Sequence, residues 1–267
     1  MMIETSLSKT EPDVIVGTPI CRRTSFILDK FLSNQQEIQQ AYPGCRLVLA
    51  TDEPDFVAEL KEQINHYHLK GKVITYETVK PDYARSHYWS VACGREALRQ
   101  YALPQGAECL LFLDSDMVYE PSVISIMKDK IQDFDVVFSG YRLFPLKGGW
   151  VFAGGCLLIN REILNKITFR CHEFKNGEMF TEDDLFQMDL FKHRARVNKG
   201  IFVSINHYRN NQEYYAIEPQ PMGWFRRVTN NLLLRYMVSK MNMLARHHIF
   251  HKLRVLLGQA AKVKLKR

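Results

Sequence analysis

The sequence predicts an α/β protein with a mostly parallel central sheet and helices on both faces. Short apolar, β-branched runs alternate with stretches of helical periodicity over the first half of the chain, which is the pattern of successive βα units. Apolar residues make up 46% of the 267 residues and charged residues 24%, so the chain can form an ordinary globular core. The length allows one large domain or two small ones.

The first half of the chain alternates four strands with three helices. Strands are expected at 13–20, 46–51, 72–79 and 108–113, and helices at 26–41, 55–67 and 87–102. Pro43 and Gly44 follow the first helix and are residue types that end helices. This order of elements predicts a parallel sheet that is covered on both faces.

The second half is less regular. Strands are expected at 135–139, 150–159 and 200–205, and helices at 161–167 and 181–194. Two glycines interrupt the strand at 150–159. The helix at 181–194 begins with three acidic residues, a charge that the helix dipole stabilises at this end. The last strand closes on Asn206, His207 and Tyr208.

Basic charge is concentrated at the end of the chain. The net charge is +7, but 11 lysines and arginines and no acidic residue fall within 224–267, which leaves 25 basic and 29 acidic residues elsewhere. Apolar residues recur there at helical spacing. We expect a main domain at 1–222 and a basic amphipathic helical tail at 223–267. The tail either binds an anionic membrane surface or packs its apolar face on the main domain.

Several other classes of protein are disfavoured. The first residues lack the charged-then-apolar pattern of a secretion signal, and no apolar run is long enough to span a membrane. The six cysteines are scattered without a CxxC pair, which argues against a zinc site or a disulfide framework.

We expect a cytoplasmic protein that becomes peripheral on the inner face of the cell membrane if the tail binds lipid. No nucleic-acid-binding motif is present, so nucleic acid is not an expected partner.

Two aspartates follow the apolar strand at 108–113. Asp114 and Asp116 are separated by one residue, at the end of a strand where ligands bind in open parallel sheets. Carboxylates this close repel each other, and an oxygen-preferring divalent cation, Mg²⁺ or Mn²⁺, removes that conflict. By itself, the Asp-Ser-Asp sequence also fits a solvated turn that caps the following segment.

The stretch LLFLDSDMVYEPSVI resembles the DxD region of the GT-A-fold glycosyltransferases, particularly their family 2-like group. In that fold the two aspartates hold a metal ion that bridges the phosphates of a nucleotide-sugar. The resemblance therefore assigns Asp114 and Asp116 to the metal, and Asp114 and Ser115 to the nucleotide-sugar site. It extends over roughly residues 13–210 and implies the GT-A fold for the main domain.

Further positions resemble the nucleotide-sugar site of the same family. Thr18 and Pro19 end the first strand, where these enzymes begin their nucleotide pocket, and Asp52 ends the second strand, where they place an acid near the base or ribose. Arg95 matches the arginine of an element on the helix before DxD, although glutamate replaces the asparagine that follows it. Arg85 is a second candidate for that arginine. Taken alone, Asp52 also fits a turn residue and each arginine fits a solvated side chain.

The later matches concern the acceptor and the metal. Gly154 and Gly155 resemble a loop near the transferred sugar, although a β-bulge also explains them. Glu182 and Asp183 resemble the acidic pair whose aspartate is the catalytic base of inverting members, although helix N-terminal acids are common. His207 stands where many members complete the metal shell with a histidine, although a single histidine is more often structural.

In combination, these features predict a metal-dependent glycosyltransferase of the hexosyltransferase class. It would use Mn²⁺ or Mg²⁺ and transfer a sugar from a UDP- or GDP-sugar to a hydroxyl of a surface glycan or lipid-linked saccharide, with inversion, in polysaccharide biosynthesis. Three alternatives stay open: a retaining GT-A transferase, a sugar nucleotidyltransferase, and a non-catalytic membrane- or glycan-binding module. The sequence does not identify the donor base, the sugar, the acceptor or the oligomeric state.

Overall fold

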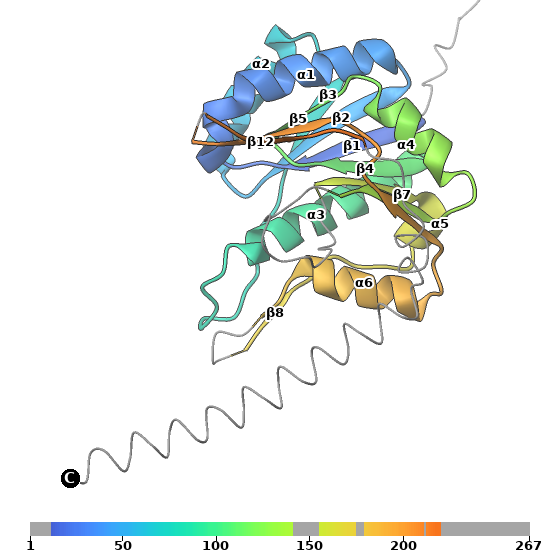
Figure 1. The fold of residues 1–267 in the computed structure, drawn as a ribbon. Coiled ribbons are helices and arrows are strands. Elements are labelled where there is room, and N and C mark those ends of the chain that lie inside the picture. Colours follow the sequence, from blue (N-terminus) through green and yellow to red (C-terminus); the bar gives the residue numbers. More distant parts are fainter. Residues whose placement is uncertain (1–11, 141–154, 175–178, 211, 220–267) are drawn as a thin grey trace, which may run out of the picture. The chain divides into compact units, whose positions relative to one another are not determined.

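The computed structural model describes residues 12–140, 155–174, 179–210 and 212–219. A seven-stranded sheet forms its centre (Figure 1). The strands lie in the order β10 (Val197–Gly200), β6 (Val136–Ser139), β7 (Cys156–Asn160), β4 (Cys109–Leu113), β1 (Val14–Pro19), β2 (Cys45–Thr51) and β3 (Gly71–Thr75). Only β7 is antiparallel to its neighbours among these described strands. The predicted mostly parallel sheet is therefore confirmed.

Helices cover both faces of this sheet, as the sequence predicts (Figure 1). The helices are α1 (Leu28–Ala41), α2 (Val57–His66), α3 (Tyr88–Ala102), α4 (Val123–Ile131), α5 (Arg161–Leu164) and α6 (Glu182–Lys192). Buried residues of α1, α2 and α4 belong to one hydrophobic cluster, and those of α3, α5 and α6 belong to a second. The sheet thus separates two cores, and each is closed by its own set of helices.

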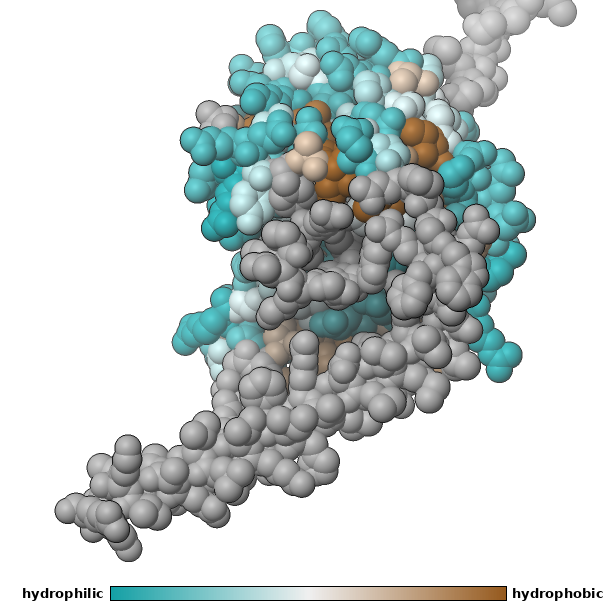
Figure 2. Space-filling model, viewed as in Figure 1, coloured by the Kyte–Doolittle hydropathy of each residue, from teal (hydrophilic) through white to brown (hydrophobic). Residues whose placement is uncertain are grey.

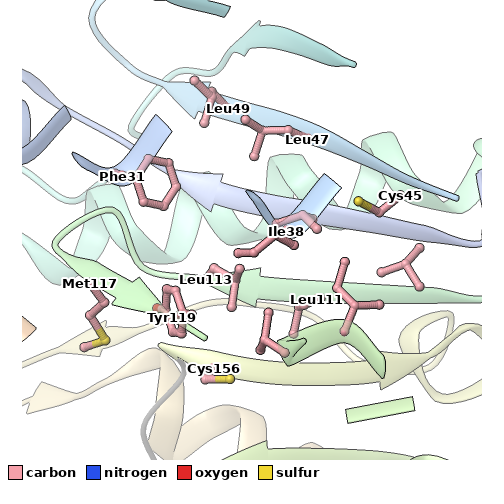
Figure 3. Packing of buried hydrophobic residues seen from close by; sticks show 14 of the residues in the cluster. Phe31, Ile38, Cys45, Leu47, Leu49, Leu111, Leu113, Met117, Tyr119 and Cys156 are labelled. Atoms are coloured by element: carbon pink, nitrogen blue, oxygen red, sulfur yellow. The ribbon is translucent and has the colours of Figure 1, made fainter. Parts of the chain in front are cut away.

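The strand side chains alternate between these two cores. In β4, Leu111 and Leu113 belong to the first cluster, whereas Leu110 and Phe112 belong to the second. Figure 3 shows Leu111 and Leu113 in the same layer as Phe31 of α1. Successive side chains of a strand point to opposite faces, so a strand buried on both faces must be apolar at every position. This requirement explains the uninterrupted apolar runs that identify the strands in the sequence.

Two smaller sheets were not expected from the sequence. One has the order β12 (Gln212–Ile217), β11 (Ile205–Arg209) and β5 (Met117–Tyr119), and the other pairs β8 (His172–Glu173) with β9 (Met179–Phe180). These strands are short or partly exposed, so they lack the apolar runs of the central strands. The β5–β11 pairing matters for the site because it places a late segment of the chain beside the turn that follows β4.

The expected strand at 200–205 is wrong. β10 ends at Gly200 and β11 begins at Ile205, so most of this stretch connects two strands. Ile201, Val203 and Ile205 are all buried, and this alternation imitates a strand. The backbone N–H of Val203 donates instead to the hydroxyl of Ser139, at 3.3 Å. As a consequence, His207 lies within a strand and does not follow one.

Several other elements differ at their boundaries. A 3₁₀ turn at Arg22–Ile27 precedes α1, and the strand expected at 72–79 ends at Thr75. The helix expected at 161–167 is a single turn. Of the strand expected at 150–159, residues 150–154 lie outside the described part of the chain, and the remainder is β7.

One face of the described residues is mostly polar. Figure 2 shows hydrophilic residues over most of the described surface in that view. Among the residues that the structure describes, no helix has both the length and the apolar character needed to cross a bilayer. The predicted tail at 223–267 lies outside the described residues, so its boundary and its helical character stay predictions.

Candidate active site

The candidate site lies where the strand order of the sheet reverses. From β1 the chain adds β2 and β3 on one side, and it then crosses back to place β4 on the other side. Open α/β sheets bind ligands beyond the carboxyl ends of their strands at such a reversal. Thr18 and Pro19 end β1, and Asp114 directly follows β4, so both groups lie at this point.

The turn that carries the two aspartates is held by buried backbone contacts. The N–H of Asp114 donates to the carbonyl of Gly155 at 3.2 Å and to the hydroxyl of Tyr119 at 2.8 Å. The hydroxyl of Tyr119 donates in turn to the same Gly155 carbonyl. Gly155 therefore supports the aspartate turn through its backbone, while Gly154 lies outside the described residues. Tyr119 was not singled out in the sequence, although it lies within the stretch that resembles the DxD region.

Asp116 and His207 meet side chain to side chain. Nε2 of His207 lies 3.1 Å from Oδ2 of Asp116. Antiparallel pairing of β11 with β5 places His207 opposite Met117, and the N–H of Tyr208 donates to the carbonyl of Asp116 at 2.9 Å. Two residues separated by 90 positions in the chain are thus fixed beside each other by a short strand pair.

Arg95 joins the aspartate turn to the start of α6. Its Nη2 lies 3.2 Å from Oδ1 of Asp114, and its Nη1 lies 3.2 Å from Oδ1 of Asp183 and 3.4 Å from Oε1 of Glu182. Only 3% of Arg95 is exposed. The structure therefore brings three predicted acidic site residues together around the guanidinium of a fourth, Arg95. Arg95 was expected to contact nucleotide, but its terminal nitrogens contact carboxylates of the protein.

The surroundings of these carboxylates favour their protonated forms. Burial raises the pKa of Asp114, Glu182 and Asp183, and each neighbouring carboxylate raises it further, while the Arg95 guanidinium opposes both effects. The pKa of Asp183 is raised to about 8. Oε2 of Glu182 is buried without a hydrogen-bond partner among the described residues, which also disfavours its charged form.

Exposure distinguishes the two acids at the start of α6. The side chain of Asp183 is 23% exposed, whereas that of Glu182 is 5% exposed. Asp183 can therefore be reached by a ligand and Glu182 is enclosed.

A capping box explains why α6 begins at this point: the hydroxyl of Thr181 accepts from the N–H of Asp184, and the carboxylate of Asp184 accepts from the N–H of Thr181.

Two residues that the sequence assigns to the nucleotide-sugar site, Thr18 and Ser115, make hydrogen bonds within the protein. The hydroxyl of Thr18 is fully buried and donates to the carbonyl of Leu113 at 2.8 Å, which ties the ends of β1 and β4 together. The hydroxyl of Ser115 is also buried and donates to the hydroxyl of Thr24 at 3.0 Å. Any contact of Thr18, Ser115 or Pro19 with a nucleotide stays a prediction.

Asp52 lies at the end of β2 and anchors a polar network. Its Oδ2 accepts from the hydroxyl of Thr78 at 2.6 Å and from that of Ser90 at 2.8 Å. The hydroxyl of Tyr76 lies 3.1 Å from that of Ser90, and burial raises the pKa of Tyr76. The three hydroxyl residues were not singled out in the sequence. Only their positions could have indicated them: Tyr76 and Thr78 lie just after β3, and Ser90 lies in the first turn of α3.

Arg85 is not brought to the carboxylates. Its side chain is exposed, and its backbone N–H donates to both oxygens of Glu173, at 3.1 Å each. Glu173 also accepts from the backbone N–H of Ser86 and from the indole of Trp89, and these bonds hold its pKa below the ordinary range. Arg85 therefore contributes backbone to a loop anchor at the start of α3.

The side chains of Asp116 and His207 lie at hydrogen-bond distance and are also the residue types that bind a divalent metal. Within the ranges that the structure covers, no group of three or more His, Cys, Asp or Glu side chains is arranged to hold an ion. Two adjacent ligands of an octahedral ion with bonds of about 2.1 Å lie about 3 Å apart, which matches the 3.1 Å between Nε2 of His207 and Oδ2 of Asp116. Such ions commonly take only one or two protein ligands and complete their shell with substrate phosphates and water.

Comparison with known proteins gives structural neighbours only. No family model matches the sequence, and no curated protein sequence matches it. The chain is similar in structure to S. aureus TarS in complex with UDP, with 18% identity, a TM-score of 0.48 and coverage of 70% of this chain and 57% of TarS 1–349. It therefore spans little more than half the length of that TarS fragment.

Two further solved structures are similar at the same level. The mannosyltransferase PcManGT from Pyrobaculum calidifontis, in complex with GDP-Man and Mn²⁺, shows 15% identity and a TM-score of 0.49, with coverage of 72% of this chain and 55% of that one. Glucosyl-3-phosphoglycerate synthase from Mycobacterium tuberculosis, with Mn²⁺ and UDP, shows 11% identity and a TM-score of 0.49, with coverage of 86% and 79%. Similarity at this level does not assign a function, which must be sought in the site itself.

Proposed function

We propose that this protein is a metal-dependent GT-A glycosyltransferase that moves a sugar from a UDP- or GDP-sugar to a hydroxyl acceptor. One observation carries the proposal. The aspartate turn after β4 and the acidic start of α6 meet around Arg95 at the strand-order reversal of the sheet. A transferase needs one group of residues for the leaving diphosphate and a separate carboxylate for the acceptor, and this arrangement offers a candidate for each.

The donor side consists of Asp116 and His207, with Asp114 next to them. Asp116 and His207 would hold Mn²⁺ or Mg²⁺, and the sequence assigns Asp114 to the same ion. When bound, the ion neutralises the charge that develops on the leaving diphosphate. Hydrogen bonds hold this turn in place: the Thr18 hydroxyl donates to the β4 carbonyl, and the Tyr119 hydroxyl accepts from the N–H of Asp114. The carboxylates are therefore oriented before the sugar donor binds.

The acceptor side consists of Asp183. Its carboxylate lies across Arg95 from Asp114 and is exposed enough to meet a hydroxyl. In an inverting transfer it would take the proton of that hydroxyl as the oxygen attacks the anomeric carbon and the bond to the diphosphate breaks. The enclosed Glu182 would stay beside it as a second partner of Arg95. Asp52 and its hydroxyl neighbours, together with Thr18, Pro19 and Ser115, would line the nucleotide side.

The acceptor and the location follow from the basic tail. A tail with 11 basic and no acidic residues is attracted to anionic lipid by about 1 kcal/mol per lysine or arginine near the surface. We infer a glycan or lipid-linked saccharide as the acceptor, at the cytoplasmic face of the membrane. Polysaccharide biosynthesis is the matching role.

A thermal-shift screen tests the donor site. The full chain is melted with Mn²⁺ or Mg²⁺ and each of UDP-, GDP-, dTDP- and CMP-sugars. A ligand that binds only the folded state raises the melting temperature by mass action. We expect one nucleotide to stabilise the protein in a metal-dependent manner, and we expect Asp116→Ala to remove that stabilisation. Asp129→Ala is the matched control, because Asp129 is an exposed aspartate on α4 that pairs with Lys130.

Product analysis distinguishes the proposal from its rivals. Incubation of the stabilising donor with the protein should release a nucleoside diphosphate. Release of pyrophosphate from a sugar phosphate and a nucleoside triphosphate would identify a nucleotidyltransferase instead. If folded protein binds none of the donors with either metal, the glycosyltransferase proposal fails in favour of a non-catalytic binding module.

A further inference from the structure

The guanidinium of Arg95 connects two parts of the site that come from distant segments of the chain. Each terminal nitrogen serves a different segment: Nη2 contacts Asp114 after β4, and Nη1 contacts Asp183 and Glu182 at the start of α6. We propose that Arg95 is a positioning residue that fixes the candidate base of α6 against the donor-side aspartate. This inference rests on the proposed function and assigns Arg95 a role other than nucleotide contact.

Close packing of α3 on the sheet fixes the position of Arg95. A Cβ atom added at Gly94 would lie 3.0 Å from the Tyr76 hydroxyl and 3.1 Å from Cβ of Pro19. A larger residue at that position would require Tyr76 or Pro19 to shift by a few tenths of an ångström, so glycine favours the close approach of this helix to the end of β1. The guanidinium also lies over the ring of Phe112, with 5.7 Å between Cζ and the ring centre. The side chain is thus enclosed by the sheet below and by carboxylates at its tip.

Charge balance explains why a buried arginine is needed here. Asp183 is surrounded by charged or titratable groups from three segments, namely Arg95 and Tyr88 of α3, Glu182 and Asp184 of α6, and Asp114 after β4. Arg95 is the cation in this group, and it lowers the pKa of Asp183 against the effects of burial and of the neighbouring carboxylates. Without it, the acids at the start of α6 would lie next to the aspartate turn without the cation that the structure places between them.

The planar fork of arginine suits this role and lysine does not. Arginine presents several N–H donors in a rigid plane, whereas lysine has one ammonium group that cannot occupy both nitrogen positions. Arg95→Lys should therefore keep the charge and lose the simultaneous contacts. Arg95→Met should lose both charge and contacts while it keeps an unbranched stem in the buried channel.

The first experiment compares donor binding with transfer. Arg95→Lys and Arg95→Met are measured beside the matched controls Arg99→Lys and Arg99→Met. Arg99 lies one turn further along α3 and pairs with Glu96, away from the site carboxylates. A misplaced catalytic group costs on the order of a hundredfold in rate, so we expect that loss in transfer for both Arg95 variants. The calorimetric Kd of UDP or GDP with Mn²⁺ should stay close to the wild-type value.

The pH profile separates positioning from general structural damage. Loss of the cation raises the pKa of Asp183, so Arg95→Met should move the acid limb of the transfer rate to higher pH. Arg95→Lys should move the limb less. A purely structural role would lower the rate by the same factor at every pH. Two results would overturn the proposal. The first is an acid limb of the transfer rate that stays at the wild-type pH in Arg95→Met. The second is a loss of nucleotide affinity as large as the loss of transfer, which would make Arg95 a ligand of the sugar donor.

A measurement without substrate keeps this test independent of the proposed function. Folded-state pKa values above the unfolded ones mean that the native protein binds extra protons, so stability falls as pH rises toward those values. Removal of Arg95 raises the pKa values of Asp183 and Glu182 further. The melting temperature of metal-free Arg95→Met should therefore fall increasingly below wild type as pH rises, and that of Arg99→Met should not. If wild type turns over no nucleotide-sugar, the proposed function fails. The positioning role of Arg95 is tested separately: it is overturned if the melting temperatures of wild type and Arg95→Met differ by the same amount at every pH.

Discussion

At the scale of single residues, burial distinguishes the two candidate acids at the start of α6. Glu182 and Asp183 are adjacent in sequence and contact the same nitrogen of Arg95. Only Asp183 keeps an exposed carboxylate, while Glu182 is enclosed with one oxygen lacking a partner among the described residues. Asp183 is still mostly buried, and this burial together with the neighbouring carboxylates raises its pKa to about 8, although Arg95 opposes the shift.

The first residue-scale prediction concerns pH. A general base must be deprotonated, so transfer should fall as pH drops below the pKa of Asp183. Because kcat/KM reports the free enzyme, its acid limb should lie near pH 8, with a loss of about tenfold per unit further below. The measurement is kcat/KM against pH at constant ionic strength. A profile that stays flat from pH 8 to well below it would exclude Asp183 as the base.

The second residue-scale prediction uses an isosteric change. Asp183→Asn removes the proton acceptor and keeps the shape of the side chain, so transfer should be abolished while nucleotide binding is spared. The exposed Asp184 offers a control, because asparagine at this position keeps an oxygen that can accept from the N–H of Thr181 and so preserves the cap. Asp184→Asn should retain transfer. Survival of transfer in Asp183→Asn would assign the proton to another group.

At the scale of elements, short strands and helix starts carry the site. β5 and β11 have three and five residues, and their pairing brings His207 to Asp116. The first turn of α6 presents Glu182 and Asp183 because the capping box of Thr181 and Asp184 fixes where the helix begins. The chemistry of both elements thus depends on backbone hydrogen bonds at their ends.

The prediction at this scale is a loss of the cap. Thr181→Ala removes the oxygen that accepts from the N–H of Asp184 and should lower the free energy of unfolding by about 1 kcal/mol. Transfer should fall as well, because the first turn of α6 positions the candidate base. Urea unfolding and transfer assays check both effects. Ser122→Ala is the control, since Ser122 stands at the N-cap of α4 and makes no capping bond. Equal effects of the two substitutions would contradict the role of the cap.

At the scale of the whole molecule, charge is divided between the main domain and the tail. The main domain has slightly more acidic than basic residues, and Arg95 contacts Asp114 in its candidate site. Residues 224–267, in contrast, contain 11 basic residues and no acidic ones. Basic amphipathic segments are attracted to anionic membranes, and that attraction weakens as salt screens it. A membrane-bound tail would hold the transferase near a lipid-linked acceptor.

The corresponding prediction is salt-sensitive lipid binding. The full chain should sediment with vesicles that contain phosphatidylserine, should be released as salt increases, and should not bind neutral phosphatidylcholine vesicles. Reversal of charge at Lys262, Lys264, Lys266 and Arg267 should weaken this binding and leave nucleotide-dependent thermal stabilisation unchanged. Equal binding of the variant and the wild type would show that these four charges do not drive the interaction.

The sequence was sufficient to predict the central architecture. β1, β2, β4 and β6 and the helices α1, α2, α3 and α6 lie close to their expected ranges. They are recognisable because strands buried on both faces are apolar at every position and helices repeat their apolar residues at helical spacing. Local chemistry likewise predicts a carboxylate pair after β4 and an acidic start to α6, since both are visible in a few consecutive residues.

Only the tertiary structure determined how these pieces meet. The approach of His207 to Asp116 depends on the β5–β11 pairing, which leaves no apolar pattern because its strands are short and partly exposed. The contacts of Arg95 with Asp114 and Asp183 join α3 to two other segments, and no local spacing encodes which way a buried arginine points. Local periodicity therefore determined the elements and the residue types of the site. Contacts between distant segments decided the partners, the burial and the protonation of its acids.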